Sequence, residues 1–192
     1  MYQNNDLEPR LLRNKPENSE IGNHCGIPDA CDREVPVWLI TLDNVPTLTM
    51  YFLGAALIWK VGWIYSVLFF VYCIVSIALF WRLICPWCHH FDTGRCPCGY
   101  GKIAPRFFVK KSGKNFKNVF RRNIAVVFPS WIIPFGVGLY LLATEYSRGT
   151  LVLFVSFCIV GFVLIPAISR LVGCKSCEIK HDCPWMSPST PH

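Results

Sequence analysis

The chain has 192 residues, of which 53% are hydrophobic and 16% charged, and its formal net charge is +7. A soluble domain usually carries about 25% charged residues, so this composition argues against an ordinary soluble globular protein. The apolar residues also form long runs, without the alternation or the one-sided pattern of a globular core. We therefore predict an all-α integral membrane protein whose apolar runs lie in lipid.

The N-terminal segment, residues 1–44, is mostly polar. It contains the stretch HCGIPDAC, in which His24, Cys25 and Cys31 are candidate metal ligands. Its acidic residues outnumber its basic ones, so it is also a candidate partner for a basic loop of the same chain. Its last part, VPVWLITL at residues 35–42, is expected to lie in the membrane interface just before the first span.

Four apolar segments predict four transmembrane helices. A helix needs about 20 residues to cross about 30 Å of hydrocarbon. Residues 63–81, 124–143 and 151–169 have this length, whereas residues 46–59 are fewer and need tilting or local bilayer thinning to span. If residues 46–59 lie in the interface instead, three spans remain and the N-terminus changes side.

The four helices are expected to form two hairpins, at residues 45–84 and 123–172, joined by a loop at residues 85–122. Nine Lys and Arg residues follow Asp92 in this loop without a further acid, whereas the two opposite turns offer only Lys60 and Arg148. Basic loops stay on the cytoplasmic side. We therefore predict a cytoplasmic loop, with both termini on that side of a prokaryotic-type cytoplasmic membrane.

The basic part of the loop predicts contact with anionic lipid headgroups. Phenylalanines are interspersed with its charges, and each basic residue near a bilayer surface contributes about 1 kcal/mol of attraction. An acidic partner or another membrane or redox protein is a second hypothesis, and nucleic acid is disfavoured because the loop is held beside the bilayer. The residues assigned to lipid contact are Arg106, Lys110, Lys111, Lys114, Lys117, Arg121 and Arg122.

The chain contains 11 cysteines, and nine of them fall on the predicted cytoplasmic side. Disulfides do not persist in a reducing cytosol, so these nine are interpreted as metal ligands or redox centres. Cys73 and Cys158 lie within expected helices instead. We interpret these two as apolar packing residues.

The loop sequence CPWCHHFDTGRCPCGYG supplies two close pairs of cysteines on a chain bent by proline and glycine. Two such pairs can close a tetrahedral four-sulfur site, and a nearby histidine can replace one thiolate. The candidate ligands of the loop are Cys85, Cys88, Cys96 and Cys98, with His89 and His90 as substitutes.

The C-terminal tail, residues 173–192, supplies a second set of soft ligands in the stretch GCKSCEIKHDCPW. Its candidate ligands are Cys174, Cys177, Cys183 and His181. Together with Cys25 and Cys31, they suggest a shared thiolate cluster on one face of the membrane. The spacing suits zinc or an iron-sulfur cluster, and metal-free thiols remain a third alternative.

Two functions follow from this pattern. The first is a non-catalytic module whose metal site clamps the cytoplasmic ends of the helices, or carries electrons if the metal is an iron-sulfur cluster. The second is a quinone-linked thiol-disulfide oxidoreductase, because four helices in a short chain with a Cys-x2-Cys pair are similar to the membrane oxidases of the DsbB and vitamin K epoxide reductase type. Metal-ion export or sensing is a third hypothesis, which the lack of polar ligands in the expected helices disfavours.

Overall fold

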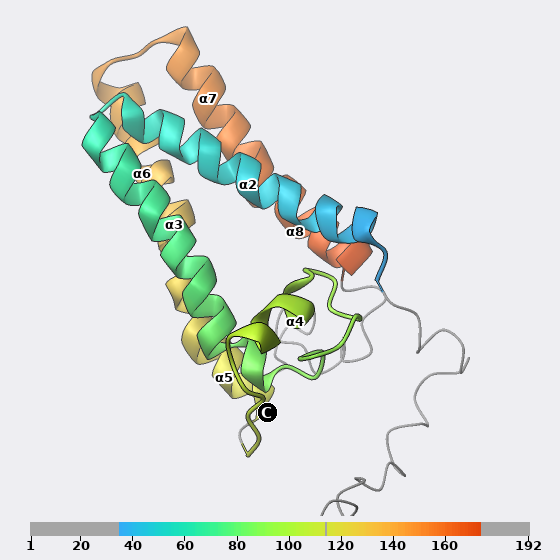
Figure 1. Cartoon of the computed structure of the whole chain (residues 1–192). Helices are drawn as coiled ribbons and strands as arrows, with labels where there is room; N and C mark the ends of the chain where they lie inside the picture. The colour runs from blue at the N-terminus through green and yellow to red at the C-terminus, as the bar shows by residue number, and fades with distance from the viewer. Residues whose placement is uncertain (1–34, 114, 174–192) are drawn as a thin grey trace, which may run out of the picture. The chain divides into compact units, whose positions relative to one another are not determined.

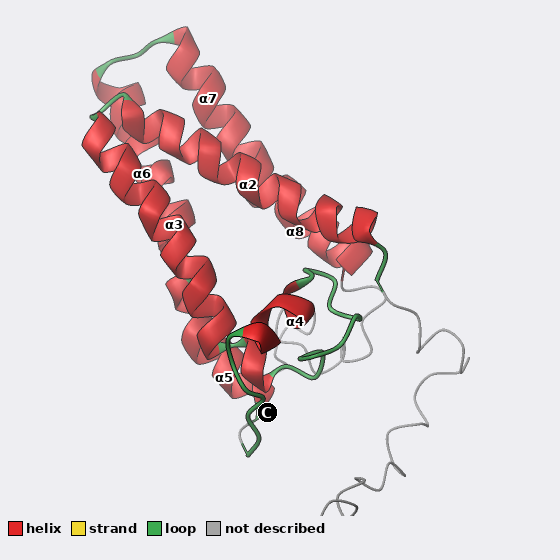
Figure 2. Ribbon diagram, in the orientation of Figure 1, coloured by secondary structure: helices red, strands yellow, loops and turns green. Residues whose placement is uncertain are grey.

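The computed structural model of the chain describes residues 35–113 and 115–173, which belong to the second of its two compact units, residues 33–192 (Figure 1). Within this part all regular structure is helical and no strand occurs (Figure 2). Three of its helical stretches are long and apolar enough to cross a membrane: Trp63–Trp87, Phe116–Thr144 and Arg148–Leu171. The predicted all-helical class is confirmed, and these stretches are compatible with an integral membrane protein.

The first helix, α2, runs without a break from Val37 to Trp59. We expected residues 35–42 to form a separate interfacial stretch, but residues 37–42 are the first turns of this helix. Thr41 donates from Oγ1 to the Val37 carbonyl (3.0 Å) and Asn44 donates from Nδ2 to the Ile40 carbonyl (2.7 Å). These polar side chains bond back to the turn before them, so they do not end the helix.

α2 is not among the three stretches that satisfy the criteria of length and hydropathy for a membrane span. It has 23 residues, which is long enough, but it carries Asp43, Asn44 and three threonines. By length and composition, three of the four expected spans qualify in the described residues, and α2 does not. Asp43 also lies inside this helix, although the sequence analysis assigned it to the polar N-terminal segment.

The helix α3, Trp63–Leu83, begins at the residue expected from the sequence and extends two residues further than predicted. A short turn connects it to α2, and Ser66 donates from Oγ to the Ala55 carbonyl across the pair (2.9 Å). The cysteine-rich loop follows, with three short helices: η1 (Cys85–Trp87), α4 (Tyr100–Ile103) and η2 (Ala104–Arg106). The amphipathic helix α5, Phe116–Asn123, leads into the second half of the chain.

The second half is less regular than a plain hairpin. A 3₁₀ turn, η3 (Ile124–Val126), precedes α6 (Pro129–Thr144), and a turn connects α6 to α7 (Arg148–Cys158). The last helical stretch then passes through the π-helical segment η4 (Ile159–Leu164), α8 (Ile165–Ile168) and the π-helical segment η5 (Ser169–Gly173). Pro129 is the first residue of α6, and Pro134 lies inside this helix. Pro129 separates the 3₁₀ turn from α6, and Pro166 lies between the two π-helical segments.

α2 is the central element of the packing. It contacts α3, α6, α7, η4 and α8, and Figure 1 shows it running beside α7 and α8. The core around it is apolar and includes Cys73, in agreement with its expected packing role. Its buried members are Met50, Tyr51, Leu57, Ile58, Phe69, Cys73 and Phe157.

Candidate thiol site

The cysteine-rich loop begins where α3 ends and folds around a small core of its own. Cys85, Phe91 and Ala104 are buried together, and Phe80, Trp81 and Tyr100 pack against them. Tyr100 meets Trp81 edge-on, with 5.6 Å between the ring centroids. Burying these rings against the end of α3 holds the loop at one end of the helical bundle.

The four cysteines of the loop lie near one another and none is in a disulfide. The Cys85 thiol is close enough to Cys96 and Cys88 to interact with both electrostatically. Cys96 and Cys98 lie closer still and share a hydrogen bond between their side chains. Thus Cys85 of the first pair lies near Cys96 of the second, although seven residues separate the two pairs in the sequence.

Cys96 is the acidic member of the group. A hydrogen bond from the Cys98 thiol lowers the pKa of Cys96 to about 6, against the opposing effect of burial. Backbone N–H groups of Gly101, Cys98 and Tyr100 add to the lowering by hydrogen bonding to the sulfur. The pKa of Cys98 is raised well above its usual value by the same shared hydrogen bond, by burial and by the nearby Asp43 carboxylate. The two thiols therefore differ in acidity, with Cys96 the more acidic member of the pair.

Glycine makes the tight path of this loop possible. Gly99 has a φ of +75°, and a Cβ there would lie 2.7 Å from Cγ2 of Ile40 in α2. At Gly101 a Cβ would lie 2.4 Å from the His90 carbonyl oxygen and 2.8 Å from Cβ of Cys96. The backbone can therefore fold back on the thiols only because these two positions carry no side chain.

The first half of α2 anchors the loop. Asn44 donates from Nδ2 to the Cys98 carbonyl (3.1 Å), and the Tyr100 hydroxyl donates to Oδ1 of the same asparagine (3.0 Å). The Val35 amide donates to the Gly94 carbonyl (2.9 Å). One amide side chain thus satisfies polar groups on either side of Gly99.

Asp43, the neighbour of Asn44, connects three parts of the molecule. Its carboxylate lies close enough to the Cys98 thiol to raise the pKa of that thiol, and it accepts a hydrogen bond from Oγ of Ser169 in η5 (3.4 Å). α2, the thiol loop and the last helical stretch therefore meet at this carboxylate. Sequence reasoning missed Asp43 and Asn44 because it assigned them to the polar N-terminal segment.

The remaining predicted ligands have different outcomes. His89 is exposed, whereas His90 is buried beneath the loop. In residues 35–113 and 115–173 no three Cys, His, Asp or Glu side chains stand in an arrangement ready to hold a metal ion. The other candidates lie outside the described residues: His24, Cys25, Cys31, Cys174, Cys177, His181 and Cys183.

The basic residues assigned to lipid contact lie on η2, on the segment after it and on α5. Arg121 and Arg122 are exposed in the last turn of α5, and Lys110 and Lys111 are exposed before it. Lys111 Nζ also lies 6.0 Å from the centroid of the Trp87 ring, so one of these charges contacts the loop. Lys114 lies outside the described residues.

Comparison of the chain with protein-family models, with curated proteins and with solved structures finds no match. The functional argument therefore depends on the chemistry of the residues described above.

Proposed function

We propose that the chain is a four-helix membrane protein whose cysteine loop binds a metal through thiolates on the cytoplasmic side, thereby clamping the ends of its helices. The metal is zinc in a structural site or an iron-sulfur cluster in an electron-transfer site. The observation that carries the proposal is the proximity, within one anchored loop, of Cys85 to Cys88 and Cys96 and of Cys96 to Cys98.

The chemistry of the four sulfurs supports a metal. Crowded thiolates repel one another, and a bound cation removes that repulsion while fixing the loop. Four thiolates suit tetrahedral zinc and also suit an iron-sulfur cluster. Because no ready group of three ligands exists in the described part of the chain, metal binding must draw the sulfurs closer together.

The membrane part of the proposal counts α2 as the fourth span. A helix of 23 residues is about 34 Å long at 1.5 Å per residue, which is enough to cross the hydrocarbon. Its polar residues Asp43 and Asn44 have partners in the loop and in η5, and α2 lies at the centre of the packing. Polar side chains are tolerated in membrane helices when neighbouring segments satisfy them in this way.

Metal analysis of anaerobically purified protein tests the proposal. We expect stoichiometric zinc, or iron with acid-labile sulfide, in the wild-type chain. The metal should be lost in a Cys85→Ser/Cys96→Ser double variant and retained in Cys158→Ser, which removes a thiol outside the loop. A wild-type chain that is reproducibly free of metal would overturn the proposal.

A second candidate, a thiol-disulfide oxidoreductase linked to quinone, is favoured by the hydrogen-bonded pair of Cys96 and Cys98. A thiolate beside a thiol can attack a substrate disulfide to form a mixed disulfide, which the second thiol resolves by displacing the substrate thiolate. In that direction the chain's dithiol is oxidised as the substrate disulfide is reduced. In the opposite direction the chain's disulfide takes two electrons from a substrate dithiol and passes them, with two protons, to a quinone, which leaves as the quinol. A metal-free chain with a reversibly formed disulfide in the loop would favour this candidate over the metal site.

A further inference from the structure

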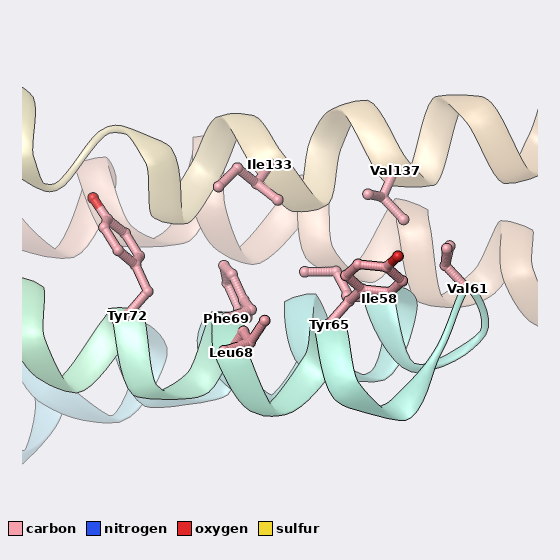
Figure 3. A pocket seen from close by; sticks show the side chains of 8 residues that line it. All are labelled: Ile58, Val61, Tyr65, Leu68, Phe69, Tyr72, Ile133 and Val137. Carbon is pink, nitrogen blue, oxygen red and sulfur yellow. The ribbon is translucent and has the colours of Figure 1, made fainter.

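An apolar groove lies between α3 and α6, remote in sequence from the thiol loop (Figure 3). Its volume is about 410 Å³. In Figure 3 the side chains of Ile133 and Val137 on α6 point toward those of α3, with Tyr72 at one end and Val61 at the other. The full lining consists of Ile58, Val61, Tyr65, Leu68, Phe69, Tyr72, Ile133 and Val137.

The groove exists because α3 and α6 each pack on α2 more than on each other. Gly54 of α2 lets both approach, since a Cβ there would lie 2.9 Å from Pro134 and 3.2 Å from Phe69. Phe69 and Ile58 form a buried floor, at 5% and 3% exposure. The rims are open, with Tyr65 and Leu68 about 60% exposed.

One end of the groove is connected to the basic helix α5. The Tyr72 hydroxyl donates to the Val126 carbonyl (2.5 Å), which joins α3 to η3 directly after α5. Arg121 and Arg122 are exposed in the last turn of α5, five and four residues before Val126. An apolar slot and a pair of cations therefore occur together on segments that are apolar enough to lie in a membrane.

We propose that this groove is a binding site for one anionic diacyl phospholipid. One acyl chain lies along Phe69 and Val137, and the phosphate headgroup binds Arg121 and Arg122. A hydrocarbon chain fits an almost wholly apolar lining within the bilayer, and the arginines supply the complementary charge for a phosphate. The site rests on the proposed membrane placement of α3 and α6, but not on the metal.

Lipid titrations of the delipidated full chain in neutral detergent test this site, with the thermal unfolding temperature as the readout. Phosphatidylglycerol should raise Tm more than phosphatidylcholine with the same acyl chains, and glycerol phosphate alone should not raise it. Val137→Trp should abolish the response by filling the groove. Ile132→Trp, at an exposed position of α6 that does not line the groove, should retain it.

The headgroup contact has its own variants. Arg121→Gln and Arg122→Gln should each weaken phosphatidylglycerol binding about fivefold and leave the phosphatidylcholine response unchanged. Arg148→Gln, at the distant start of α7, should change neither. If Val137→Trp does not fold, Val137→Phe and the arginine variants carry the test.

Three results would overturn the site: equal responses of Val137→Trp and Ile132→Trp, a full response to glycerol phosphate, or saturation by an isoprenoid quinone in place of phospholipid. Release of the chain from membranes by alkaline carbonate is a separate outcome, because it would overturn the membrane placement itself.

Discussion

Cys96 and Cys98 differ in acidity although a single proline separates them. The Cys98 thiol and three backbone N–H groups stabilise the Cys96 thiolate, whereas burial and the Asp43 carboxylate disfavour a thiolate at Cys98. The asymmetry therefore comes from the fold of residues 96–101. This difference in acidity cannot be predicted from the spacing of the cysteines or from the charge of the sequence.

A pH series of alkylation in metal-free protein should reveal this asymmetry. The pKa of Cys96 in the folded chain is about 6, below the ordinary thiol value of 9.0, so its thiolate form is present above pH 6 and is lost as the pH falls through that value. We expect iodoacetamide to modify Cys96 with a midpoint near pH 6, as read by peptide mass spectrometry. In the chain unfolded by denaturant, the midpoint of Cys96 modification should rise to that of an ordinary cysteine. If the folded chain shows the same high midpoint as the unfolded chain, Cys96 is not the acidic thiol of the loop.

Gly101 should tolerate no side chain. The substitution Gly101→Ala places a Cβ against the His90 carbonyl and Cys96, and relieving such a clash costs about 1–3 kcal/mol of folding free energy. We expect a lower Tm and loss of the acidic Cys96 signature. Gly136→Ala is the matched control: nothing lies within 4 Å of its Cβ in helix α6, so it should be neutral or slightly stabilising.

At the scale of elements, hydropathy predicted α3 well and α2 poorly. α3 begins at Trp63 as expected because the whole run is apolar and has no competing polar residue. In the sequence, the polar residues Asp43 and Asn44 suggest that a helix ends or begins there, although α2 continues through them. Their bonding partners at Cys98, Tyr100 and Ser169 are more than 50 residues away, and no local pattern reveals such partners.

The candidate site was predicted in the same uneven way. Spacing alone singled out the cysteine pairs of the loop, which the fold brings near one another. The anchoring residues Asn44 and Tyr100 are ordinary polar residues in sequence, and only the tertiary contact between α2 and the loop identifies them.

The contact between α2 and the loop should depend on one amide. Asn44→Ala leaves the Cys98 carbonyl and the Tyr100 hydroxyl without this partner, at a cost of about 1–3 kcal/mol where such groups stay buried. Hydrogen exchange should become faster in residues 94–101, with little change in α3. Thr41→Ala removes a hydrogen bond within α2 alone, so it should leave exchange in the loop unchanged; equal effects of the two variants would argue against the anchor.

At the scale of the whole molecule, the central question is what surrounds α2. Three other helical stretches present broad apolar surfaces. Large apolar side chains on them, such as Leu68, Val152 and Val163, are at least 60% exposed. Lipid covers such surfaces without cost, whereas water does not. α2 packs among these stretches, so we expect it to share their environment even though its own composition is more polar.

This packing predicts that α2 crosses the membrane. If it does, the N-terminus and residues 107–113 lie on the same side, whereas a chain with three spans puts them on opposite sides. A protease site inserted before residue 35 and another after Gly113 should be cut in the same orientation of sealed vesicles, and one inserted after Tyr146 in the opposite orientation. The excess of basic residues after Asp92 predicts that the shared side is cytoplasmic. Cleavage at the first two sites in opposite orientations would show that α2 does not span, and it would require Asp43 and the thiol loop to be satisfied at the bilayer surface instead.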